Sequence, residues 1–218
     1  MIERIIDGIN YHLNEDNKSA EVAYLEDEEG YAGDINIPET VKFNEVPYRV
    51  TTVGKRAFSC CYSLTAISLP DSVVSIGVRA FADCRKLSAI TIPHSVKSIE
   101  ERAFLTCFSL RYVTIPDSVT SIEKRAFSGC ESLTAIILPD SVVSIGEGAF
   151  LDCESLEEIV IGKSVTSIGA ETFCRCESLI DIRFQGTIAQ WRKIELGNNW
   201  NDEVPAKVVH CTDGDVEI

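Results

Sequence analysis

The chain has 218 residues, of which 45% are hydrophobic and 25% are charged, and this is the composition of an ordinary folded domain. No stretch approaches the 18 or so consecutive apolar residues of a membrane-spanning helix, which argues against membrane insertion. The formal net charge of −14 and the pI near 4.6 argue against nucleic acid and anionic lipid as partners, because the long-range field of the protein repels both.

Two short segments of apolar and β-forming residues open the chain. Residues 9–13 and 20–25 flank a polar segment at 14–18, and this pattern predicts a β-hairpin. We therefore assign residues 1–34 to an N-terminal β-hairpin cap. The first seven residues contain no basic region, long apolar run or small-residue cleavage site, so no export signal is visible in this chain. We expect a cytoplasmic protein unless a leader has been removed.

A 23-residue period dominates the chain after this segment. Phenylalanines recur at Phe58, Phe81, Phe104, Phe127, Phe150 and Phe173, and cysteines at Cys61, Cys84, Cys107, Cys130, Cys153 and Cys176. Repeats of this length indicate a solenoid, in which each coil buries its apolar side chains only against its neighbours. We place about six coils in residues 35–184, on the basis of this period. A hairpin insertion at residues 43–48 is predicted in the first coil.

Each repeat predicts the same succession of elements, as residues 64–86 illustrate. Leu64 and Ile67 lie on the buried side of a short strand, and Pro70 ends it because proline has no amide hydrogen for a continuing ladder. Residues 73–76 predict a second short parallel strand. The Ala-Phe-x-x-Cys segment that follows predicts a short helical turn, because residues four apart share one face of a helix.

The period stops near the C-terminus, and residues 185–218 predict a cap made of a helix and a hairpin. Ile188, Trp191 and Ile194 have the apolar spacing of a short amphipathic helix. Residues 206–210 and 215–218 flank a turn segment that contains Gly214, which predicts a hairpin over the last open strand edge.

The repeat Leu-x-x-Ile-x-Ile-Pro-x-Ser-Val-x-Ser-Ile-Gly-x-x-Ala-Phe-x-x-Cys resembles the BspA-like class of leucine-rich repeats, which occurs in many bacterial proteins. The resemblance covers residues 35–184, and segments 6–11 and 186–191 are similar to flanking pieces of that family. It implies a right-handed β-solenoid with a parallel sheet. For some secreted members it implies attachment to host matrix proteins or to other cells. No catalytic residues come with the family.

The outward positions of the long strands form the candidate ligand-binding face. Toward the C-terminal side these positions combine aromatic, apolar and charged residues, a mixture typical of recognition surfaces. The candidate residues are Arg111, Tyr112, Thr114, Ile137, Glu157, Val160 and Arg183. The alternative is that they are ordinary β-forming residues on an exposed sheet.

A row of arginines precedes the Ala-Phe pair in four repeats and is a weaker candidate for an anion-binding site. The row consists of Arg56, Arg79, Arg102 and Arg125. Stacked guanidinium groups can hold a sulfated or carboxylated glycan through paired hydrogen bonds. The alternative is that Glu100, Glu101 and Glu123 pair with the arginines, in surface pairs of little energetic consequence.

The remaining motifs do not point to chemistry. The cysteines of the repeats lie side by side, so their sulfurs do not converge on a metal or a disulfide, and we expect them to be buried packing residues. The three histidines lie far apart in the sequence, and no catalytic triad, phosphate-binding loop or dinucleotide motif is present. We expect no metal and no cofactor.

The sequence therefore predicts a non-enzymatic binding module that recognises a protein or a glycan through its exposed sheet. Cell-surface adhesion, with host extracellular matrix as the ligand, is one form of that function. The alternative is an intracellular structural or assembly protein with no adhesive role, which the missing signal and the unpaired cysteines favour.

Overall fold

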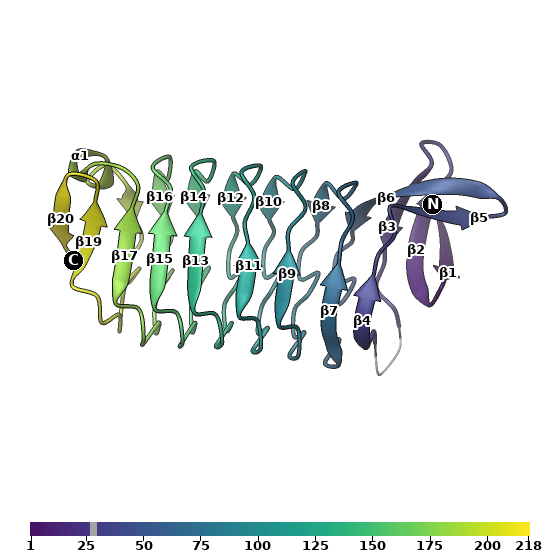
Figure 1. The fold of residues 1–218 in the computed structure, drawn as a ribbon, viewed down its shortest axis with the longest axis horizontal. Helices are drawn as coiled ribbons and strands as arrows, with labels where there is room; N and C mark the ends of the chain where they lie inside the picture. Colours follow the sequence, from purple (N-terminus) through teal and green to yellow (C-terminus); the bar gives the residue numbers. More distant parts are fainter. Residues whose placement is uncertain (27–29) are drawn as a thin grey trace.

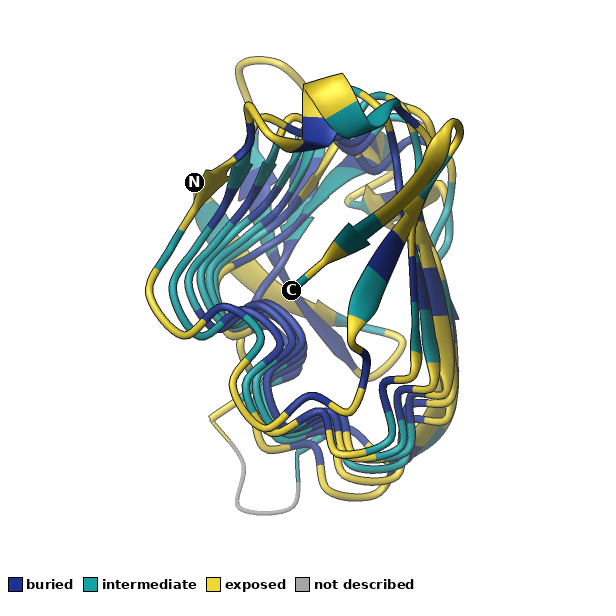
Figure 2. Cartoon of the chain, turned by 90° about the vertical axis from the view of Figure 1, so that its left-hand side faces the viewer, coloured by how far each residue is buried: buried dark blue, intermediate teal, exposed yellow. Residues whose placement is uncertain are grey.

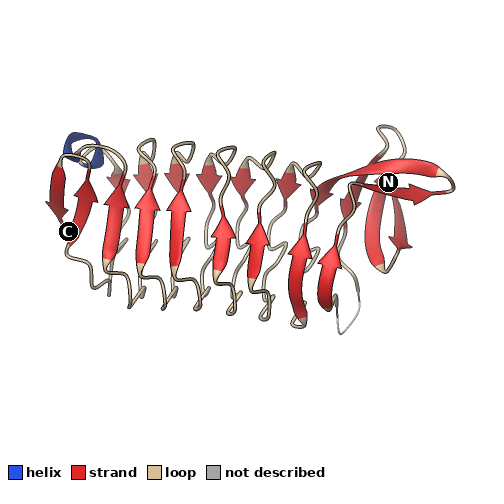
Figure 3. Cartoon of the chain, viewed as in Figure 1, coloured by secondary structure: helices blue, strands red, loops and turns tan. Residues whose placement is uncertain are grey.

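The computed structural model describes residues 1–26 and 30–218 and forms an elongated row of strands (Figure 1). The chain is rich in strands and has almost no helix (Figure 3). Residues 27–29, which belong to the predicted N-terminal cap, lie outside the described residues.

Three strands open the chain at one end of the row. β1 (Ile2–Ile6), β2 (Ile9–Asn14) and β3 (Ser19–Val22) pair antiparallel in sequence order. The inner side of β2 is buried, because Tyr11 and Leu13 are 1% and 0% exposed. β3 then pairs parallel with a strand of the first coil, so this unit continues directly into the stack.

A hairpin widens the first coil, at the place where the sequence predicts an insertion. β5 (Thr40–Phe43) and β6 (Val46–Val53) pair antiparallel. Asn44 and Glu45 form the two-residue turn, with φ angles of 49° and 60°, which is the backbone that short hairpins require. β6 lies between β3 and β8 (Ser75–Ile76) and pairs parallel with both, which connects the N-terminal strands to the coils.

Each coil contributes one longer strand to one side of the stack, and neighbouring strands that pair are parallel. These strands are β4 (Gly33–Asn36), β7 (Leu64–Ser68), β9 (Ala89–Thr91), β11 (Tyr112–Thr114), β13 (Ala135–Leu138), β15 (Glu158–Ile161) and β17 (Asp181–Phe184). The ladder is interrupted between β7 and β9 and between β11 and β13. From β13 onward the ladder is continuous, and Ile136 pairs with Ile159, which pairs in turn with Ile182.

Two-residue strands form a second ladder on another side of each coil (Figure 2). They are β10 (Ser98–Ile99), β12 (Ser121–Ile122), β14 (Ser144–Ile145), β16 (Ser167–Ile168) and β18 (Glu195–Leu196). The isoleucine of each Ser-Ile pair points inward and is buried, while the serine is half-buried. The predicted second strand of the repeat is therefore present in these coils.

The core is a column of phenylalanine rings, which we call the phenylalanine spine. Phe58, Phe81, Phe104, Phe127, Phe150 and Phe173 are all 0% exposed. Their ring centroids are 5.2 to 5.6 Å apart, and neighbouring planes differ by 0° to 14°. A tilted ring stands at each end of the spine, with Tyr31 at 52° to Phe58 and Trp200 at 76° to Phe173.

The repeat cysteines line the same interior, which confirms the prediction that they are packing residues. All six are buried, and none is in a disulfide. From Cys84 onward, each thiol donates a hydrogen bond to the carbonyl oxygen of a phenylalanine in the preceding coil, at 3.1 to 3.3 Å between sulfur and oxygen. These bonds tie neighbouring coils together from inside.

The predicted helical turns are wrong, because the segment around each Ala-Phe pair is a series of tight turns. In the first coil the amides of Ala57 and Ser59 bond three residues back, while the amides of Arg56 and Phe58 bond to carbonyls of the next coil. Every second amide therefore donates its hydrogen bond to the next coil, which excludes a continuous helix. The left-handed backbone at Arg56, with φ of 59°, also breaks helical geometry.

The C-terminal residues leave the repeat. α1 (Ile188–Trp191) is one turn long and begins at Thr187, which forms a capping box with Gln190. β19 (Val208–Cys211) pairs parallel with β17 and antiparallel with β20 (Gly214–Glu217). The short helix and the hairpin that the sequence predicts within residues 185–218 are thus both present.

Candidate ligand-binding face

The outward side chains of the long strands form a surface that we call the sheet face. Its residues follow the strand register, because side chains in a parallel ladder stack directly beside their partners. One row of the sheet face contains Ile137, Val160, Arg183 and His210. A second row contains Ala135, Glu158 and Asp181.

The most exposed large apolar residues after Met1 lie on this face. Tyr112 is 68% exposed, and Ile137 and Ile180 are each 66% exposed. Exposed apolar side chains scattered singly are normal, but these three come from strands or strand entrances within a few coils of one another. The sequence analysis selected Tyr112 and Ile137 as candidate ligand-binding residues but did not select Ile180.

A shallow hollow lies beside the Tyr112 side chain. Ala89 is the register partner of Tyr112, and the hollow is lined by these two residues together with Thr91, Thr114 and the edge of Ile67. In the next coil the repeat places Ala135 at the same position. The tyrosine ring therefore stands above small neighbours, which leaves its faces accessible to a ligand.

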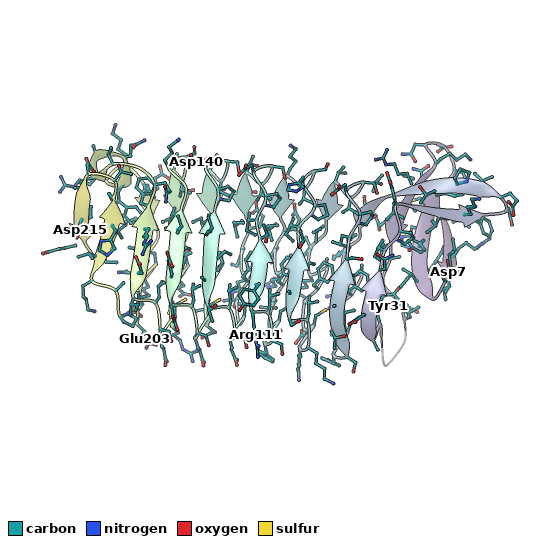
Figure 4. All side chains as sticks on the ribbon, viewed as in Figure 1. Asp7, Tyr31, Arg111, Asp140, Glu203 and Asp215 are labelled. Atoms are coloured by element: carbon teal, nitrogen blue, oxygen red, sulfur yellow. The ribbon has the colours of Figure 1, made fainter. Side chains whose placement is uncertain are left out.

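The C-terminal part of the sheet face is charged and largely neutralised within the chain. The Arg183 guanidinium donates to both oxygens of Asp181, with Nη2 to Oδ2 at 2.6 Å, and it lies 3.3 Å from Glu158. These carboxylates raise the pKa of Arg183 above its usual value. In the neighbouring coil His210 Nδ1 lies 2.8 Å from Asp215, which Figure 4 labels on the terminal hairpin.

The structure brings together some of the predicted ligand residues and separates others. Ile137, Val160 and Arg183 are adjacent in one row, and Glu157 is exposed just before β15. Arg111 and Thr114 are exposed on the other side of the ladder break, and Figure 4 labels Arg111 at the start of β11. The candidates therefore form two subsets. One lies at β11 and contains Arg111, Tyr112 and Thr114, and the other lies on β13 to β17, where Arg183 is paired with carboxylates of the chain.

The candidate arginine row is divided in a similar way. All four arginines have left-handed backbones, with φ between 53° and 59°. Arg102 donates to Glu101 of its own coil. Glu100 and Glu123, however, accept hydrogen bonds from Ser98 and Ser121 and form no arginine pair among the described residues. The expected continuous row of arginines is therefore not uniform in its environment.

Burial controls the chemistry of the thiols. It raises the pKa of Cys61 to about 11, and it raises the pKa of Cys84, Cys107, Cys130 and Cys153 further. A thiol that stays protonated is a poor nucleophile and a poor metal ligand. Within residues 1–26 and 30–218, no group of three His, Cys, Asp or Glu side chains is arranged to hold a metal ion.

The repeated parallel strands and the buried leucine, phenylalanine and cysteine positions define a leucine-rich repeat protein, and this fold supports a protein-interaction module. The model of the BspA type leucine-rich repeat region matches residues 39–113 and 97–195, with six copies of the repeat. The chain therefore belongs to the BspA-type leucine-rich repeat family. Proteins of this family are in general non-enzymatic binding modules.

Solved structures agree with this assignment. The leucine-rich repeat protein of T. pallidum is 30% identical, with a TM-score of 0.72 over 96% of this chain and 86% of that protein. A leucine-rich repeat protein from Bacteroides ovatus is 23% identical, with a TM-score of 0.70 over 96% and 71% of the two chains. The pneumococcal vaccine antigen PcpA shares the fold at 15% identity, with a TM-score of 0.60 over 96% and 70%.

No functionally curated protein matches this chain. Among the described residues, no helix has the length and apolar character needed to cross a membrane.

Proposed function

We propose that the chain is a right-handed solenoid, closed at both ends by its terminal segments, that binds a protein or glycan ligand through the sheet face. The observation that carries this proposal is the exposure of Tyr112, Ile137 and Ile180 on one rigid surface. A free surface that exposes large apolar groups on rigid strands loses little conformational entropy when it binds a partner.

The chemistry of the patch suits macromolecular recognition. Tyr112 provides an aromatic ring and a hydroxyl, and aromatic residues and arginine dominate the energetics of protein interfaces. Arg111 immediately precedes Tyr112 and forms no ion pair among the described residues. From β11 to β17 the face is about 14 Å wide at ordinary strand spacing, which is room for a side-chain cluster of a partner or a short run of sugars.

The charged edge of the patch favours a ligand with a basic group. Glu157 is exposed, and Glu158 and Asp181 share the single guanidinium of Arg183. Together with the formal charge of −14, these carboxylates steer cationic partners toward the face. Adhesion to host extracellular matrix is one role that such recognition could serve.

Binding of the purified protein to arrays of matrix proteins and glycans tests this proposal. The double variant Arg111→Ala and Tyr112→Ala is compared with Tyr62→Ala, which removes a 44% exposed tyrosine that packs on Arg85 in the turn before β7. We expect the double variant to lose at least about 30-fold in affinity, the size of an interface hot spot. Equal affinity of the two variants for the ligand would refute binding at Arg111 and Tyr112. Absence of saturable binding across the arrays would favour an assembly role.

A further inference from the structure

A groove on the turn side of the first coils contains three cationic side chains in a chain that is acidic overall. Lys55, Arg56 and Arg79 line it, together with Ser59 and the side chain of Tyr24. We call it the basic groove. It lies where the N-terminal strands meet the coils, and its lining shares no residue with the sheet face.

The cations of the basic groove differ from the later members of the arginine row. The guanidinium groups of Arg56 and Arg79 make no ion pair with a carboxylate of the described residues, whereas Arg102 is held by Glu101. The carboxylate that lines the groove, Asp83, is engaged by others: it accepts from the Thr106 hydroxyl at 3.0 Å and lies 3.8 Å from Arg85. Positive charge in the groove is therefore not cancelled by its own lining.

The backbone at these positions is one that glycine adopts at no steric cost. Arg56 and Arg79 have φ angles of 59° and 55°, and in the fifth coil the equivalent position is Gly148, with φ of 58°. A large side chain in a left-handed conformation is strained. Arg102 and Arg125 have the same backbone, so this conformation belongs to the repeat, and a glycine at either groove position can remove the guanidinium without changing the fold.

The spacing of the two arginines suits a single oxyanion. Their amides bond to the following coils in the same way, Arg56 to Val78 and Arg79 to Glu101, each at 3.0 Å. The rings of Phe58 and Phe81, two positions further along, are 5.2 Å apart, so the arginine side chains start about one coil spacing apart. Two guanidinium groups at this separation can donate to the oxygens of one tetrahedral anion, and Lys55 adds a third charge.

We propose that the basic groove binds an oxyanion of phosphate or sulfate type, either free or as a group on a larger molecule. Distant carboxylates do not prevent this, because the Debye length of about 8 Å at physiological ionic strength screens them while contacts at hydrogen-bond distance persist. The site is independent of ligand binding at the sheet face.

The experiment titrates the full chain with inorganic phosphate and with sulfate, at constant ionic strength against chloride, and follows amide chemical shifts. The test variant is Arg56→Gly with Arg79→Gly, which keeps both amide hydrogens and the left-handed backbone. The matched control is Arg102→Gly with Arg125→Gly, which removes the same number of positive charges at the same repeat position outside the groove. We expect saturable shifts around residues 55–60 and 79, a loss of at least tenfold in affinity in the double variant, and a change of less than twofold in the control.

The outcomes separate the proposal from its alternatives. No saturable shift at the groove in the unmodified chain, or equal losses in the double variant and the control, would overturn it. A melting temperature of the double variant at or above that of the parent excludes misfolding as the cause of a loss. Phosphoserine and glucosamine 6-sulfate, titrated in parallel, indicate by their relative affinities whether the anion comes from a phosphorylated or a sulfated source.

Discussion

The phenylalanine spine and the sheet face belong to the same coils but follow opposite patterns. Inside, the ring positions repeat without exception, and neighbouring planes are nearly parallel. Outside, the row that contains Ile137 continues with Val160 and then Arg183, so its chemistry changes from apolar to charged within three coils. The comparison indicates that the interior determines the fold by repetition, while the face can vary without disturbing it.

The largest expected effect concerns the interior alone, and it is a loss of stability at alkaline pH. Burial raises the pKa of Cys61 to about 11 and raises the pKa of Cys84, Cys107, Cys130 and Cys153 more. Below about pH 8.5 the thiols are protonated in both the folded and the unfolded chain, so their full contribution to the free energy of unfolding is present. Above that pH the unfolded chain releases protons that the folded chain retains, so the free energy of unfolding falls as the pH rises.

Five such thiols together should lower the free energy of unfolding by up to about 7 kcal/mol per pH unit, at about 1.4 kcal/mol for each proton. Urea denaturation at pH 8, 9 and 10 in the presence of a reductant measures this slope. The variant Cys107→Val should reduce the slope by one proton. A free energy of unfolding that stays constant from pH 8 to 10 would contradict the burial of the thiols.

The next effect is a cavity in the phenylalanine spine. Phe127 lies between Phe104 and Phe150, with centroids 5.2 and 5.5 Å away, and it is fully buried. Phe127→Ala should lower the free energy of unfolding by about 3 to 5 kcal/mol, because adjoining coils cannot close the space. Tyr112→Ala on the sheet face is the control and should change it by less than about 0.5 kcal/mol. If both variants lost the same free energy of unfolding, the spine would not contribute more to stability than the sheet face, which would contradict this prediction.

The smallest effect is a gain in stability at a left-handed arginine. Arg79→Gly should raise the free energy of unfolding by up to about 1 kcal/mol, because relief of roughly 1 to 2 kcal/mol of backbone strain is partly offset by the greater freedom of glycine in the unfolded chain. Thermal melting measures the change. Gly148→Arg, the reverse substitution in the fifth coil, should be destabilising, and a stabilising result there would contradict the strain argument.

The sequence was sufficient to predict the coils because every repeat has the same apolar positions. The identity of the buried residues followed from the 23-residue period, and Cys107 or Phe127 could be placed in the core without a structure. The terminal hairpins and the short helix at Ile188–Trp191 were also visible from local patterns. These features depend on local chemistry or on repetition, which a single sequence displays directly.

The tight turns and the site geometry could not be predicted in the same way. Ala and Cys four residues apart fit one face of a helix, and only the amide bonds to the next coil exclude that helix. A clue was available, because the repeat position of Arg125 is taken by Gly148 in the next coil. The neutralisation of Arg183 by Asp181 and Glu158 depends on side-chain rotamers and strand register, which the repeat pattern does not specify.

The tilted rings at the two ends of the phenylalanine spine make the number of coils adjustable. Tyr31 and Trp200 meet the terminal phenylalanines at 52° and 76°, so neither extends the parallel stack, and each needs only one phenylalanine to pack against. A 23-residue unit duplicated or deleted between them would leave both junctions unchanged. Gene duplication can therefore lengthen the molecule by one strand spacing of about 4.8 Å at a time. In this architecture the number of repeats sets the length of the molecule, and no new fold is required to change it.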